Sequence, residues 1–234
     1  MVRGRTVVPA RALPDSELGG FTLAVEPSGV VLGRDSAAAP VLVRMFGPQP
    51  TRVAFVGGWW AGQILACRCL AHGAAIVVDA PATPAPAQHG LMAGLSQWLA
   101  LDRWVGGSGQ RVRPMASDAS TVWPASASQP LLRWHDVGPA GPTGRPDLQA
   151  WQTQLIVLSV VTPASLPVLS GVDMVLTQRL DPPEAALLGS ALLLGPELVA
   201  RISAMDNEMV AAFRGRAMRY VWLNPTPVER QMFG

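Results

Sequence analysis

The chain has 234 residues, of which 49% are hydrophobic and 15% charged, so it can bury one sizeable core and is neither disordered nor fibrous. Its 18 basic and 16 acidic residues leave a net charge of +2, which is too small to indicate binding to nucleic acid. All the basic residues are arginine, because the sequence contains no lysine. Schiff-base chemistry and the lysine of a working phosphate-binding loop are therefore excluded.

The beginning of the chain predicts a loose arm and a small β-meander. Residues 1–20 mix Pro, Gly and charged side chains, as is typical of an N-terminal arm. Residues 21–50 contain short β-prone runs that are separated by turns containing Pro or Gly, which favours an antiparallel hairpin or meander. The expected strands are 21–25, 30–34 and 41–46.

A parallel βαβ unit follows and is the strongest pattern in the sequence. Residues 53–56 and 75–79 are continuous apolar runs, typical of strands that are buried on both faces. The segment between them has the length of one helix, 62–72, and Gly73 follows as its C-cap. Another helix is expected over 90–105, where apolar residues recur at helical spacing.

The second half of the chain returns to an α/β pattern after an irregular insert. This insert, 111–150, is rich in proline and contains one expected strand, 131–134. The later elements are strands at 154–161, 173–177 and 218–223, and helices at 164–169, 182–194 and 196–213, before a Pro-broken tail at 224–234. We therefore predict a single α/β domain over 21–223 with its core over 51–223. It should have a mostly parallel sheet with helices on both faces, as in a degenerate P-loop or Rossmann-like fold.

The glycine-rich turn between the first strand and helix of this unit is the candidate site. Gly57 to Gln63 occupy the place where backbone amides and the positive end of a helix bind phosphate. The spacing fits a phosphate-binding loop, but Gln63 replaces the lysine and Ile64 replaces the hydroxyl residue that binds Mg²⁺. We therefore expect no ATP hydrolysis and assign no catalytic residue.

Two other interpretations of this turn stay open. In a dinucleotide-binding fold, Gly57, Gly58 and Gly62 would approach the phosphates of an adenine nucleotide or NAD(P), and Asp79 would bind a ribose. Alternatively, the glycines form a tight strand-to-helix turn with close packing, the adjacent tryptophans are buried, and no cofactor binds.

The remaining reactive residue types predict no further chemistry. Cys67 and Cys69 lie two apart in the expected helix, so they face different directions and cannot form a disulfide. The three histidines lack the spacing of a metal site, and no metal is expected. His135 and Asp136 belong to no hydrolase motif, and His135 is interpreted as a loop residue that is bonded to local backbone groups.

The order of the segments resembles that of FtsK/HerA-type motor ATPases. A short hairpin, 31–35 with 40–43, precedes the stretch 52–64 that carries the glycines, and the next strand ends at Asp79. Farther along the chain, Ser159 occupies the position of the Walker B aspartate. This resemblance implies the fold of a motor ATPase without its chemistry.

The sequence also resembles EccE-like components of actinobacterial type VII (ESX) secretion. Four stretches carry this resemblance: VLGRD, TRVAFVGG, residues 132–155 and the ending RYVWLNPTPVERQMFG. The resemblance implies a non-catalytic scaffold or adaptor that contacts the secretion ATPase or its membrane complex, as a homodimer or within a membrane-associated assembly. It also implies a cytoplasmic location, with the inner face of the cell membrane as a site of peripheral attachment. EccE proteins carry membrane helices, whereas we predict neither a transmembrane segment nor a secretory signal in this chain.

Overall fold

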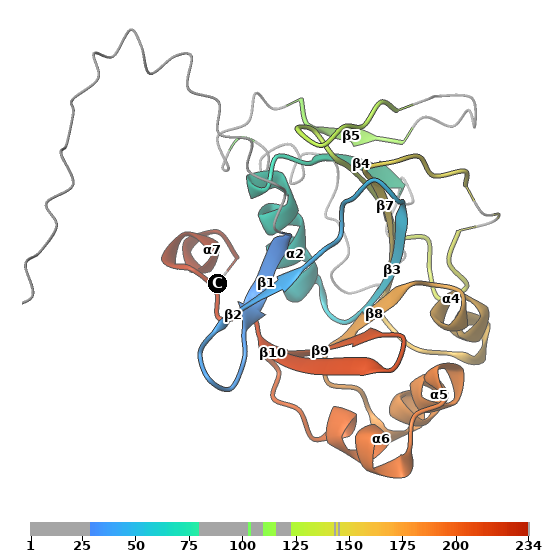
Figure 1. Ribbon diagram of the computed structural model, residues 1–234. Helices are drawn as coiled ribbons and strands as arrows, with labels where there is room; N and C mark the ends of the chain where they lie inside the picture. Colours follow the sequence, from blue (N-terminus) through green and yellow to red (C-terminus); the bar gives the residue numbers. More distant parts are fainter. Residues whose placement is uncertain are drawn as a thin grey trace, which may run out of the picture.

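The computed structural model describes residues 29–79, 103, 110–115, 123–142, 144 and 146–233 (Figure 1). Within these ranges the strands form one sheet, in the order β2-β1-β10-β9-β8-β3-β7-β6-β4-β5. The strands are β1 Val30–Arg34, β2 Pro40–Val43, β3 Thr51–Val56, β4 Ala75–Asp79, β5 Val112–Pro114, β6 Leu131–His135, β7 Gln152–Leu158, β8 Met174–Thr177, β9 Met209–Arg214 and β10 Ala217–Trp222. The helices are α2 Trp59–Ala71, η1 Pro163–Ser165, α4 Leu166–Ser170, α5 Pro182–Leu192, α6 Pro196–Ser203 and α7 Pro227–Phe233.

The sheet has a parallel part and an antiparallel part. Strands β8, β3, β7, β6, β4 and β5 pair in parallel, whereas β9, β10, β1 and β2 continue the sheet with antiparallel pairing. All seven residues of β7 are buried, as expected for a central parallel strand with chain on both of its faces. This arrangement confirms the predicted α/β class with a mostly parallel sheet.

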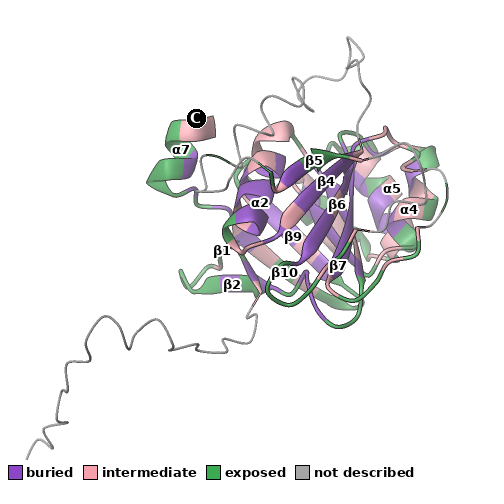
Figure 2. Ribbon diagram, turned by 90° about the horizontal axis from the view of Figure 1, so that it is seen from above, coloured by how far each residue is buried: buried purple, intermediate pink, exposed green. Residues whose placement is uncertain are grey.

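Two hydrophobic clusters lie on opposite faces of the sheet. Phe55, Trp134 and Leu155 belong to the cluster under α2, whereas Ile156 and Phe213 belong to the cluster under α4, α5 and α6. Figure 1 shows α2 on one side of the sheet and these three helices on the other, and Figure 2 shows that burial is concentrated in the central strands. Helices therefore cover both faces, as the sequence predicted.

The helix predicted over 196–213 is wrong. Helix α6 ends at Ser203, the N–H of Met209 donates to the carbonyl of Asp206 in a turn, and β9 follows and pairs with β8 and β10. Val210 packs in the α2-side cluster and Phe213 in the opposite one. Because both faces of β9 are buried, the strand shows no alternation of apolar and polar residues that would distinguish it from a helix.

The described residues of the insert predicted over 111–150 contribute two strands to the sheet. The predicted strand 131–134 is confirmed as β6, which lies between β4 and β7, and β5 is an additional short strand that we did not predict. The arm 1–20, the strand 21–25 and all of the helix 90–105 except Arg103 lie outside the described residues. Within the described ranges, no helix is both long and apolar enough to cross a bilayer.

The C-terminal tail forms helix α7, which is attached to α2 by a buried ion pair. Arg68 Nε donates to Glu229 Oε1 at 2.7 Å, and its Nη2 donates to Glu229 Oε2 at 2.9 Å. The same guanidinium donates to the carbonyl oxygens of Leu32 and Leu223, and the N–H of Thr226 donates to Glu229 at 2.7 Å. Burial alone would raise the pKa of Glu229, but the bonds from Arg68 and Thr226 outweigh it and hold that pKa below its ordinary value.

We predict that Arg68→Met lowers the free energy of unfolding by about 3 kcal/mol or more, because it leaves a buried, unpaired carboxylate. Urea unfolding followed by circular dichroism measures the effect. The double variant Arg68→Met/Glu229→Met should recover part of the loss, since an apolar pair removes the unpaired charge. The control is Arg201→Gln on the exposed face of α6. A loss for Arg68→Met no larger than that of the control would contradict the prediction.

Candidate functional site

Helix α2 begins where a phosphate-binding loop would lie. Such a loop wraps its backbone amides around the phosphates before the helix starts. Here β3 ends at Val56 and α2 begins at Trp59, so three of the four residues between Gly57 and Gly62 are already helical. The N–H of Gly62 donates to the carbonyl of Gly58 at 3.2 Å, as in an ordinary helical turn. The backbone therefore does not open into a phosphate cradle.

Gln178, which directly follows β8, contacts the N-terminus of α2. Its Oε1 accepts a hydrogen bond from the N–H of Gly58 at 2.7 Å, and its Nε2 donates to the carbonyl of Asn207 at 2.9 Å. A Cβ on Gly57 would lie 2.6 Å from this Oε1 and 2.9 Å from Cζ of Phe55. The carboxamide oxygen therefore occupies a position that an anion would take at this helix end.

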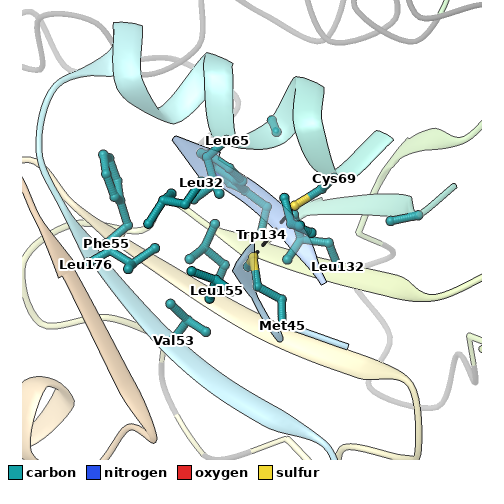
Figure 3. Close-up of a cluster of buried hydrophobic side chains, with 14 of the residues drawn as sticks. Leu32, Met45, Val53, Phe55, Leu65, Cys69, Leu132, Trp134, Leu155 and Leu176 are labelled. Atoms are coloured by element: carbon teal, nitrogen blue, oxygen red, sulfur yellow. Dashed lines mark hydrogen bonds between the residues drawn. The ribbon is translucent and has the colours of Figure 1, made fainter. Parts of the chain in front are cut away.

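The other residues of the candidate loop also belong to the protein interior. Ile64 is fully buried, and Trp59 and Trp60 are partly buried against the α2-side cluster. The ring of Trp59 stands edge-on to that of Trp134, with 6.5 Å between their centroids. A Cβ on Gly62 would lie 3.4 Å from the Trp134 ring, which Figure 3 shows between the sheet and α2. These contacts are those of a tight turn with close packing.

Asp79 lies at the end of β4, away from the glycine turn. The strand order β3-β7-β6-β4 places β4 three strands from β3, or about 14 Å at ordinary strand spacing. A dinucleotide-binding fold instead has the ribose-binding acid on the strand beside the glycine turn. The structure brings together Gly57, Gly58 and Gly62 but not Asp79, and a nucleotide-binding role for these residues and Gln63 stays a prediction.

Three titratable side chains gather at the ends of β4 and β6. The interpretation of His135 as a loop residue is wrong, because it is the last residue of β6 and its Nδ1 bonds Asp79 Oδ2 at 2.9 Å. Burial lowers the pKa of His135, and the bond to Asp79 opposes this effect only in part. Burial raises the pKa of Asp136 to about 6. Sequence reasoning treated these two residues as unimportant, although the buried strand before them already placed them at this edge of the sheet.

Ser159 is exposed, whereas Cys67 and Cys69 are buried. Ser159 is exposed directly after β7, the strand beside β3, and its correspondence to the Walker B position stays a prediction. Cys67 and Cys69 are free buried thiols, as predicted, and burial is the main cause that raises their pKa to about 11 and about 12. In the part of the chain that the structure describes, no group of three or more His, Cys, Asp or Glu residues is placed to hold a metal ion.

Comparisons with known proteins identify the fold. No protein-family profile matches the sequence, and no curated protein matches it. VirB4 of Thermoanaerobacter pseudethanolicus is similar in structure, with a TM-score of 0.55 and 10% identity over 87% of this chain and 98% of that chain. At this identity the likeness shows the fold alone: the chain folds like VirB4, which is consistent with a P-loop-like α/β fold.

Two further solved structures have lower scores. The genome packaging NTPase B204 from Sulfolobus turreted icosahedral virus 2, in complex with ATP-gammaS, has a TM-score of 0.44 and 10% identity over 73% of this chain and 96% of that chain. The cytoplasmic domain of the Thermomonospora curvata Type VII Secretion ATPase EccC has a TM-score of 0.48 and 12% identity. That comparison covers 95% of this chain but 33% of the EccC chain.

We predict that Gly57→Ala destabilises the protein by about 2 kcal/mol, because the new methyl group collides with the Phe55 ring and the Gln178 carboxamide. Gly58→Ala is the matched control, since its Cβ would lie 3.7 Å from Gln178 Oε1, and should cost no more than about 1 kcal/mol. Thermal and urea unfolding measure both values. Equal stabilities of the two variants would show that the turn is more open than described.

Asp136 should make stability depend on pH. Its pKa is about 6 in the folded protein and 3.8 ordinarily, so above about pH 4 the unfolded chain loses this proton more readily than the folded chain does. The contribution of Asp136 to the free energy of unfolding therefore falls as pH rises through 6, by up to about 3 kcal/mol in total. Asp136→Asn, which cannot ionise, should gain stability relative to the native chain between pH 4 and pH 7.5. The control Asp206→Asn, at an exposed position, should show no such gain. If the stability difference between Asp136→Asn and the native chain does not change with pH, the raised pKa of Asp136 is contradicted.

Proposed function

We propose that this chain is a non-catalytic member of the P-loop ATPase fold that acts as a scaffold or adaptor through protein contacts, beside the ATPase or the membrane complex of a type VII secretion system. The observation that carries the non-catalytic part is the start of α2 at Trp59, in the place of a phosphate-binding loop. Gln178 then bonds the amide of Gly58 at 2.7 Å. The bond from Gln178 occupies one backbone donor at the start of α2, and the helical turn stands in place of the open loop on which phosphate binding in this fold depends.

The missing side chains support the same proposal. Phosphoryl transfer needs positive charge near the γ-phosphate, which a lysine and a bound Mg²⁺ ordinarily supply. The chain contains no lysine, Gln63 and Ile64 stand at the two motif positions, and Ile64 is fully buried. Ser159, at the position predicted for the Walker B aspartate, cannot replace a carboxylate as a Mg²⁺ ligand.

The class of partner rests on the sequence resemblance to EccE-like components. A chain that has the fold of an ATPase but not its catalytic residues would act by binding other proteins through its surface. We infer that these surfaces contact components of the secretion machine, and that binding does not depend on nucleotide. Self-association as a homodimer belongs to the same proposal, and light scattering of the purified chain measures it.

The first test is a thermal-shift series of the purified chain with Mg-ATP, ADP, NAD and NADP, each at millimolar concentration. A ligand present at 100 times its Kd would add about 2.7 kcal/mol, which raises the Tm of a chain of this size by roughly 5 to 10 °C. We expect no shift with any of them. A shift that disappears in Gly62→Trp would contradict the proposal and support the nucleotide-binding alternative.

The same preparation tests the partner. The tagged chain is immobilised and mixed with the type VII secretion ATPase encoded in the same genome, with and without Mg-ATP. A hexameric ATPase of unrelated function serves as the control. We expect the secretion ATPase to be retained equally in both conditions and the control not at all. Failure to retain the ATPase or membrane-complex components in either condition would overturn the assignment of the partner.

A further inference from the structure

A row of polar side chains crosses the face of the sheet that lies opposite α2. In the parallel register, Gln154 of β7 pairs with Arg52 of β3 on one side and with Arg133 of β6 on the other. Paired residues of parallel strands point to the same face, and successive residues point to opposite faces. The next residue on each strand belongs to the α2-side cluster, namely Val53, Leu155 and Trp134. The row of Arg52, Gln154 and Arg133 therefore faces the other way.

One buried nitrogen on each side chain of this row lacks a hydrogen-bond partner. Gln154 is 1% exposed, and its Nε2 has no hydrogen-bond partner, nor do the buried Nε atoms of Arg52 and Arg133. The guanidinium of Arg52 reaches the carbonyl of Pro146 at 3.4 Å, which is long for a hydrogen bond. In the described part of the chain, neither arginine forms an ion pair with a carboxylate. Such a group of unpaired donors inside a fold costs stability unless a ligand satisfies it.

The charge and geometry of the row define the ligand that fits. Adjacent strands lie about 4.8 Å apart, so the Cα atoms of Arg52 and Arg133 are about 10 Å apart with Gln154 between them. From that separation, two long side chains can converge on one group above the amide. The row supplies two positive charges, and a phosphate monoester carries a charge of about −1.5 to −2 at pH 7. Guanidinium groups are also the donors that match phosphate oxygens in pairs.

Two carboxylates near the row, those of Asp79 and Asp173, are bonded to other groups. His135 lies two residues beyond Arg133 on β6, and its Nδ1 bonds Asp79 Oδ2 at 2.9 Å. The carboxylate of Asp173 accepts from the backbone N–H of Arg52 at 2.7 Å and not from its guanidinium. Among the described residues, neither of these two carboxylates forms an ion pair with Arg52 or Arg133.

We propose that Arg52, Gln154 and Arg133 form a binding site for a phosphate group, carried either by inorganic phosphate or by a phosphate monoester. The amide of Gln154 lies at the centre and the two guanidinium groups bind from either side. This site is separate from the glycine turn, because Arg52 precedes Gly57 by five residues of extended strand, or about 16 Å. Its presence or absence does not depend on the proposed function.

Isothermal titration with sodium phosphate tests the site, at an ionic strength held constant with sodium chloride. We expect saturable binding at one site per chain in the native protein. Arg133→Gln and Gln154→Leu should each weaken it about tenfold or more, since each removes donors to a charged group. Arg201→Gln changes the net charge by the same amount as Arg133→Gln but lies on an exposed face of α6, and it should bind like the native chain.

Circular dichroism and thermal unfolding of each variant separate lost binding from lost folding. If Arg133→Gln does not fold, Arg133→Lys takes its place, because lysine keeps the charge but loses the planar pair of donors. A second titration with O-phosphoserine distinguishes the two sources of the phosphate group. Tighter binding of O-phosphoserine identifies a monoester, and binding of inorganic phosphate alone identifies the free anion. No saturable binding of either probe, or equal binding in Arg133→Gln and Arg201→Gln, overturns the proposal.

Discussion

Helix α2 is held at both of its ends by side chains from the last third of the sequence, and the rest of the structure depends on this attachment. At its start, Gln178 bonds the amide of Gly58. Near its end, Arg68 bonds Glu229 of α7 and the carbonyls of Leu32 and Leu223. Leu32 and Leu223 lie in or directly after the antiparallel strands, so one guanidinium joins the helix to that part of the sheet and to the C-terminal helix.

The close packing of α2 explains why the fold carries no phosphate cradle. Gly62 allows the helix to approach Trp134, and Trp59 then packs edge-on against the same ring. Those contacts bury apolar surface, which stabilises the chain, but they require residues 59–61 to be helical. In a working phosphate-binding loop the corresponding residues leave the helix and turn their amides toward the ligand. Here the same residues contribute to the core instead.

The two faces of the sheet have different chemical character. The face under α2 is mainly apolar, with Val53, Phe55 and Leu176 on it (Figure 3), and the hydroxyl of its buried Thr153 donates to the carbonyl of Met45. The opposite face has its apolar cluster under α4, α5 and α6, whereas β6 and β7 present Arg133, Gln154 and His135 there. Among the described residues, most buried side-chain polar atoms without a hydrogen-bond partner lie on this second face, on Arg52, Arg133, His135 and Gln154.

The sequence by itself determined the α/β class, the βαβ unit that ends at Asp79 and the absence of any lysine, because these follow from local composition and continuous apolar runs. It could not distinguish β9 from a helix, since Val210 and Phe213 are buried on opposite faces and fit either periodicity. Only the tertiary structure showed that Gln178 bonds the start of α2 and that Asp79 lies away from the glycine turn. Both depend on the order in which distant strands pair, and strand order is set by contacts between residues far apart in the chain, which no local pattern records.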